Sequence, residues 1–124
     1  MADNPSTTIL LVEDEALIRM LGVIALEDAG FTVLEAVDAD DAMRLLGDDG
    51  GDICLLFSDI DMPGDMNGLA LARLVHDRWP DIRLLLTSGH HHITGDRIPQ
   101  DGRFMSKPWR EEVLVAEVNA LLHP

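Results

Sequence analysis

The sequence predicts an α/β fold, a doubly wound five-stranded parallel sheet of flavodoxin-like order 2-1-3-4-5 with helices on both faces. Short apolar runs alternate with longer segments in which apolar residues recur at helical spacing. The central runs at 9–12, 53–57 and 84–86 are apolar at every position, which is typical of parallel strands covered on both faces. Right-handed crossovers make this strand order the simplest way to connect such elements.

The first strand and helix are expected at residues 8–12 and 16–29. The apolar residues that share one face of this helix are Leu17, Leu21 and Ile24. Gly30 follows directly and supplies the left-handed stop that ends many helices. These two elements form the first half of a strand-helix-strand unit.

The second strand is expected at 31–36, and Asp38 can cap the helix that follows it. Its inward residues are predicted to be Ala42, Leu45 and Leu46. Glycines then interrupt the pattern at positions 47, 50 and 51, so we expect the helix to end at Gly47.

The third strand is expected at 53–58, and the next helix runs from Asn67 or Gly68 to Arg78. Its inward residues are predicted to be Leu71, Leu74 and Val75. The pair Trp79-Pro80 ends this helix because the residue before proline leaves the α region.

The last elements are strands at 82–87 and 102–106 and a helix that Pro108 can start. The apolar stripe of that helix consists of Leu114, Val118 and Leu121. Between the two strands, residues 90–101 hold glycine, proline and three consecutive histidines, which are poor helix formers. We therefore expect the fourth helix to be short or irregular.

Length and charge narrow the class of protein. The 124 residues fit one domain, expected at 7–122 after a flexible stretch at 1–6, and no output domain is expected after Leu122. A net charge of -14 repels nucleic acid and anionic membranes. The single cysteine, Cys54, excludes an internal disulfide, and no signal peptide or membrane-length apolar run is present. We expect a cytoplasmic protein.

Polar residues stand at the ends of four predicted strands: Glu13 and Asp14, Asp59, Thr87 and Lys107. The carboxyl ends of parallel strands meet at one edge of the sheet, so these residues are expected to lie together. Gathered carboxylates repel one another unless a cation neutralises them. Oxygen ligands of this kind suit Mg²⁺, which often bridges carboxylates to a phosphoryl group.

A carboxylate in such a site can act as a nucleophile toward phosphorus. Asp59 is the candidate, because it follows the central strand directly. Lys107 can neutralise the charge that develops on the phosphoryl oxygens, and the hydroxyl of Thr87 can donate a hydrogen bond to one of them.

At this point the chain resembles the receiver domain of a two-component response regulator along residues 9–122. The motifs that carry the resemblance occur in order. They are Glu13-Asp14 after an apolar strand, Asp59-Ile60-Asp61-Met62-Pro63, Thr87-Ser88-Gly89, and Phe104-Met105-Ser106-Lys107-Pro108.

The resemblance implies a role for each matching residue. Asp59 would be the phosphoacceptor, and Thr87 and Lys107 would contact its phosphoryl group. The Mg²⁺ ligands would be Glu13 through water, Asp14 and Asp59 directly, and Asp61 through its backbone carbonyl. Thr87 and Phe104 would form the conformational switch.

The predicted function is that of a stand-alone receiver. It would accept a phosphoryl group from the phosphohistidine of a sensor histidine kinase or phosphotransfer protein and signal by protein contact or as a phosphate sink. Any catalysis would be limited to its own phosphotransfer and dephosphorylation. We expect a monomer or a phosphorylation-linked dimer.

Two alternatives are open on the sequence. A degenerate receiver would act as a binding module without phosphorylation. A haloacid-dehalogenase-like phosphatase is a second alternative, because Asp59-Ile60-Asp61 after an apolar strand resembles the nucleophile and acid of that family. Those enzymes carry the pair on their first strand, whereas here it follows the third.

Overall fold

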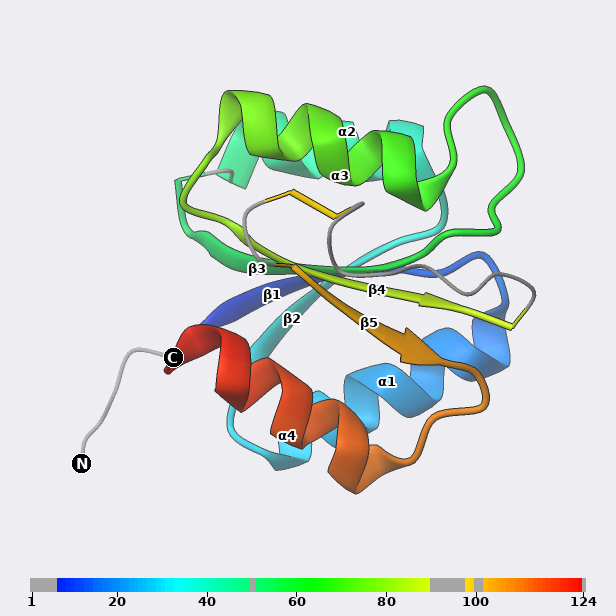
Figure 1. Cartoon of the computed structure of the whole chain (residues 1–124), viewed down its shortest axis with the longest axis vertical. Helices are drawn as coiled ribbons and strands as arrows, with labels where there is room; N and C mark the ends of the chain where they lie inside the picture. The colour runs from blue at the N-terminus through cyan, green and yellow to red at the C-terminus, as the bar shows by residue number, and fades with distance from the viewer. Residues whose placement is uncertain (1–6, 50, 90–97, 100–101, 124) are drawn as a thin grey trace.

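A five-stranded parallel sheet forms the centre of the molecule (Figure 1). The structure is a computed structural model that describes residues 7–49, 51–89, 98–99 and 102–123. The strands are β1 (Thr8–Val12), β2 (Thr32–Ala36), β3 (Ile53–Asp59), β4 (Arg83–Ser88) and β5 (Arg103–Ser106). Their order across the sheet is β2-β1-β3-β4-β5, and every neighbouring pair is parallel. The predicted topology is confirmed.

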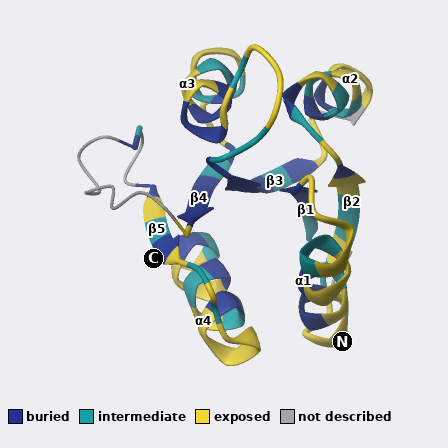
Figure 2. Ribbon diagram, turned by 90° about the vertical axis from the view of Figure 1, so that its right-hand side faces the viewer, coloured by how far each residue is buried: buried dark blue, intermediate teal, exposed yellow. Residues whose placement is uncertain are grey.

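Helices cover both faces of this sheet. Those in the described part of the chain are α1 (Ala16–Asp28), α2 (Ala39–Asp49), α3 (Gly68–Arg78) and α4 (Glu111–Leu122). Figure 2 shows α2 and α3 together on one face and α1 and α4 on the other. The short or irregular fourth helix predicted at 90–101 falls outside the described residues, apart from positions 98 and 99.

Two apolar cores lie on the two faces of the sheet, and β1 contributes to both. Leu10 and Val12 pack with residues of α2 and α3, whereas Ile9 and Leu11 pack with residues of α1 and α4. All four side chains are buried. This explains why the central strands are apolar at every position, since each face of the sheet meets a helical layer.

The ends of the helices follow local signals in the sequence. Gly30 has φ +99°, a conformation that glycine adopts without strain, and it follows the end of α1. The Asp38 carboxylate accepts the Asp41 N–H at 2.9 Å near the start of α2, and the Asn67 side chain accepts the Ala70 N–H at the start of α3.

Two predicted helix ends are wrong. Helix α2 continues through Gly47 to Asp49, because a single exposed glycine costs a helix only about 1 kcal/mol. Helix α4 begins at Glu111 instead of Pro108, because Arg110 has an extended backbone, with φ -95° and ψ 149°, and forms the N-cap.

Helix α1 presents an apolar face to solvent. Leu17, Leu21 and Ile24 share a face as predicted, but they are 65%, 51% and 47% exposed. The helix contacts the core through Ala25 and Leu26. Among the described residues no helix combines the length and apolar character needed to cross a membrane.

Candidate functional site

The carboxyl ends of β1, β3, β4 and β5 bring the predicted site residues to one edge of the sheet. Asp59 and Thr87 are register partners at the ends of β3 and β4. Glu13 follows β1, and Lys107 follows β5. Residues separated by up to 94 positions therefore surround Asp59.

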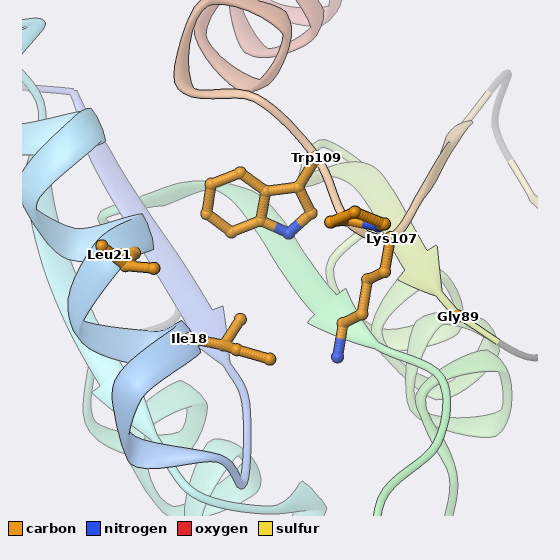
Figure 3. Close-up of a pocket in the computed structure, with 6 residues that line it drawn as sticks. Ile18, Leu21, Gly89, Lys107 and Trp109 are labelled. Atoms are coloured by element: carbon orange, nitrogen blue, oxygen red, sulfur yellow. The ribbon is translucent and has the colours of Figure 1, made fainter.

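Lys107 connects two buried carboxylates. Its Nζ lies 2.9 Å from Glu13 Oε1 and 3.2 Å from Asp59 Oδ2. The lysine side chain is 16% exposed and both carboxylate side chains are 4% exposed. In Figure 3 it extends from the loop after β5, with its ammonium group pointing away from Trp109. One cation thus compensates two acids.

Burial is the largest single contribution to the pKa shifts of these three groups. Desolvation raises the pKa of Asp59 above its ordinary value, although Lys107 and the Asp61 N–H act against it. Burial also raises the pKa of Glu13, against hydrogen bonds from Lys107 and the Glu15 N–H. For Lys107 burial lowers the pKa, but its two carboxylate partners outweigh burial and the net pKa is raised. A further cation would relieve the two acids.

A metal ion fits the acidic side of the site. Glu13, Asp14 and Asp59 each offer a carboxylate oxygen, and these oxygens all lie within 4.8 Å of one another. Asp14 is exposed while the other two are buried, so the cluster opens to solvent through Asp14. An all-oxygen donor set suits a hard ion such as Mg²⁺.

The hydroxyl of Thr87 has no hydrogen-bond partner among the described residues. Its Oγ1 is fully buried, in a residue that is 1% exposed. Buried hydroxyls in native proteins nearly always bond to a protein group, an ordered water or a ligand, so the Thr87 hydroxyl has a free hydrogen-bonding capacity beside Asp59. Thr87 and Asp59 line the same small cavity, together with Glu13. An acceptor bound beside Asp59 would satisfy this hydroxyl.

The backbone braces this edge of the sheet. The Ile60 N–H donates to the Thr87 carbonyl at 2.8 Å, and the Lys107 N–H donates to the Ser88 carbonyl at 3.0 Å. Gly68 packs so closely that an added Cβ would lie 2.1 Å from the Asp59 carbonyl oxygen. The loops after β3 and β5 are therefore held against the end of β4.

The other predicted site residues occupy different positions. Asp61 turns its side chain toward β4, where its Oδ2 accepts the Ser88 hydroxyl at 2.6 Å. Phe104 lies on β5, partly buried against the core under α2 and α3. Ser88 and Gly68 were not predicted as site residues. The only signal in the sequence for Ser88 was its position inside the Thr87-Ser88-Gly89 motif.

An apolar groove opens beside the site, between α1 and the loop that leads into α4. Figure 3 shows Ile18 and Leu21 facing Trp109 across it, with Lys107 at one side. The groove has a volume of about 370 Å³. Lys107, which pairs with Glu13 and Asp59, is one of the residues that line it.

Comparisons with known proteins agree with this geometry. The family model described as the response regulator receiver domain matches residues 9–119. Over 120 residues the chain is 37% identical to the sensor kinase CckA of Brucella abortus, covering 94% of this chain but 13% of CckA. It is 32% identical to the response regulator receiver protein CpdR of the same organism, covering 92% of this chain and 95% of CpdR.

A solved structure has the same fold. A response regulator receiver protein from Sinorhizobium medicae superposes with a TM-score of 0.86 at 28% identity, and 94% of each chain is covered.

Proposed function

The chain belongs to the response regulator receiver family, and from this premise we propose that it is a phosphoacceptor in which Asp59 takes a phosphoryl group from a phosphohistidine. The observation that carries the proposal is the surroundings of Asp59. A buried carboxylate pairs with the Lys107 ammonium, lines one small cavity with Thr87, and belongs to an acidic cluster that can hold a metal.

In the proposed reaction, Asp59 Oδ attacks the phosphorus of the donor. An O–P bond forms as the N–P bond to the donor imidazole breaks, and the imidazole nitrogen keeps the electron pair and takes up a proton. Lys107 turns from Glu13 toward a phosphoryl oxygen, and Thr87 donates its hydroxyl to another. Lys107 already pairs with Asp59, and Thr87 lines the same small cavity as Asp59.

Glu13, Asp14 and Asp59, with the backbone carbonyl of Asp61, would hold Mg²⁺. The ion, when bound, neutralises negative charge on the carboxylates and on the phosphoryl oxygens. We propose Thr87 and Phe104 as the switch. A hydroxyl drawn toward the phosphoryl group moves the end of β4, which is paired with β5, the strand that carries Phe104.

The donor is proposed to be a sensor histidine kinase or a phosphotransfer protein. Apolar side chains on the exposed face of α1 support a protein contact at this edge: Leu17, Met20, Leu21 and Ile24. One of them, Leu21, lines the groove that Lys107 also lines. A partner that covers them brings its phosphohistidine close to Asp59.

We propose that residues 7–122 form the functional unit and that it signals by protein contact or as a phosphate sink. The similarity to CpdR, which the chain matches along 95% of its length, supports a receiver that works by itself. A cytoplasmic location and a monomer or phosphorylation-linked dimer belong to the same proposal. The receiver family, whose members are phosphoacceptors, favours this function over a phosphatase.

Intact-mass measurement with acetyl phosphate tests the proposal. Wild type with Mg²⁺ should gain one phosphoryl group, and Asp59→Asn or wild type with EDTA should gain none. Asp41→Asn is the matched control, because this acid lies in the first turn of α2, outside the acidic cluster, and its loss should leave the adduct intact.

The contrary outcome is equally specific. If wild type forms neither an adduct nor a stable beryllofluoride complex in Mg²⁺, the phosphoacceptor proposal is wrong. The protein is then a receiver that binds partners without phosphorylation.

A further inference from the structure

A hydrogen bond between Ser88 and Asp61 joins the end of β4 to the loop after β3. The Ser88 Oγ donates to Asp61 Oδ2 at 2.6 Å, a short distance typical of a hydroxyl bonded to a carboxylate. Ser88 is 1% exposed, and its carbonyl accepts the Lys107 N–H. The residue that carries this hydroxyl is therefore buried and bonded to the loop after β5, and the Asp61 carboxylate is bonded to it.

The Asp61 carboxylate, which accepts this bond, lies outside the acidic cluster. Asp61 is two residues from Asp59, and its N–H donates to Asp59 Oδ1 at 3.2 Å. Yet the cluster with oxygens within 4.8 Å consists, among the described residues, of Glu13, Asp14 and Asp59 alone. The backbone of Asp61 borders the cluster while its side chain turns to the next strand.

We propose that Ser88 is a positioning residue that holds the Asp61 carboxylate on β4 and so keeps it from acting as an additional side-chain ligand of the cation. The inference rests on the proposed Mg²⁺ site. It assigns a function to a hydroxyl that neither attacks nor binds the phosphoryl group. With the side chain held away, Asp61 can offer the cation its backbone carbonyl.

Holding this carboxylate away has two consequences. A fourth carboxylate beside the cation would bind it more tightly, because opposite charges attract strongly in a partly buried site. It would also place negative charge beside the phosphoryl group, which repels it. Ser88 thereby sets a lower Mg²⁺ affinity and protects the phosphorylated form.

Magnesium titration of the unphosphorylated protein by calorimetry tests the inference. Ser88→Ala should bind Mg²⁺ about fivefold more tightly than wild type, since the released carboxylate can turn toward the cation. A merely structural role predicts the opposite sign, because a loosened site binds its ion more weakly. Unchanged or weaker binding by a folded Ser88→Ala protein would overturn the inference.

Ser58→Ala is the matched control. Ser58 is also a buried serine at this edge, at the end of β3, but its hydroxyl donates to the Asp59 backbone carbonyl at 3.0 Å. Removing it loosens the site without releasing a carboxylate, so Mg²⁺ binding should not tighten. Equal tightening in both variants would contradict a specific role for Ser88.

The double variant Ser88→Ala/Asp61→Asn identifies the group that is released. Without a carboxylate at position 61, removal of the hydroxyl should no longer tighten Mg²⁺ binding. If tightening persists, Asp61 is not responsible and the inference fails. Where Ser88→Ala does not fold, Ser88→Cys keeps the size with a weaker donor and should show a smaller increase in affinity.

These titrations need no phosphotransfer, so the role of Ser88 and the phosphoacceptor function can be tested independently. If Mg²⁺ binding follows the pattern but wild type accepts no phosphoryl group, the phosphoacceptor proposal fails and the role of Ser88 stands. If wild type is phosphorylated but Ser88→Ala binds Mg²⁺ no more tightly, the reverse holds.

Discussion

Two ion pairs in this molecule have similar lengths and opposite surroundings. Lys107 lies 2.9 Å from Glu13, and Arg44 lies 2.7 Å from Asp41 on α2. The side chains of the first pair are 16% and 4% exposed, whereas those of the second are 64% and 25% exposed. Distance alone therefore does not distinguish a buried ion pair from an exposed one.

The carboxyl groups of the two ion pairs have pKa values shifted in opposite directions. A hydrogen bond from Arg44, with another from the Val37 N–H, lowers the pKa of Asp41. Burial raises the pKa of Glu13 despite its bond to Lys107. On α2 the surroundings of Asp41 favour its charged form, whereas at the sheet edge burial disfavours the charged form of Glu13, and a bound cation would offset that cost. The two regions thus differ in the direction in which their surroundings shift the pKa of a carboxyl group.

The largest expected effect is the loss of the buried cation. Lys107→Met should lower the free energy of unfolding by about 3–5 kcal/mol in metal-free buffer at neutral pH, because it leaves two buried carboxylates uncompensated. The surface counterpart, Arg44→Met, should cost less than about 1 kcal/mol. Urea unfolding of the two variants measures both values. Equal costs would show that burial does not separate the pairs.

Adding a methyl group to a glycine should have opposite effects on stability at the crowded sheet edge and on the exposed part of α2. Gly68→Ala places a Cβ 2.1 Å from the Asp59 carbonyl oxygen and should cost about 2–3 kcal/mol through backbone displacement. Gly47→Ala meets no atom within 4 Å and should stabilise α2 by roughly 0.5–1 kcal/mol. Thermal unfolding of both variants tests the contrast, and a tolerated Gly68→Ala would mean that this edge can relax.

The smallest expected effect is on the pH dependence of stability. Because the pKa of Asp59 is raised by burial, its contribution is fully present below its ordinary pKa and is lost as pH rises through the raised value. The pKa of Asp41 is lowered, so its contribution is present above its ordinary pKa and is lost as pH falls through the lowered value.

Unfolding of metal-free protein between about pH 3 and 7 should therefore respond differently to two substitutions. Asp59→Asn should remove part of the loss of stability on raising pH, and Asp41→Asn should remove part of the loss on lowering it. The effect of Asp41 should be under about 1 kcal/mol, because the pair is exposed. The same direction of change in both variants would contradict the comparison.

Much of the fold was predictable because the sheet is built from short, strongly apolar runs. Such runs leave few alternatives for the strands, and the residues at their ends then follow from parallel topology. This is why Glu13, Asp14 and Asp59 were expected at one place before any coordinates, and the structure brings their oxygens within 4.8 Å.

What sequence reasoning missed depends on three-dimensional context. Gly47 was expected to end α2, but an isolated glycine weakens a helix without determining its boundary. The apolar face of α1 was recognised, yet periodicity does not say whether such a face is covered. The bond between Ser88 and Asp61 spans 27 residues and depends on the register of β3 against β4, which no local pattern encodes.

The positions of the first strand and the last helix have a practical consequence for the design of fusion proteins. Thr8 opens β1 and Leu122 closes α4, and both lie toward the edge of the sheet opposite Asp59 (Figure 1). A fluorescent protein fused at either position would stand away from the groove lined by Lys107. The fold therefore offers two attachment points for a reporter protein that would leave the edge with Asp59 and Lys107 uncovered.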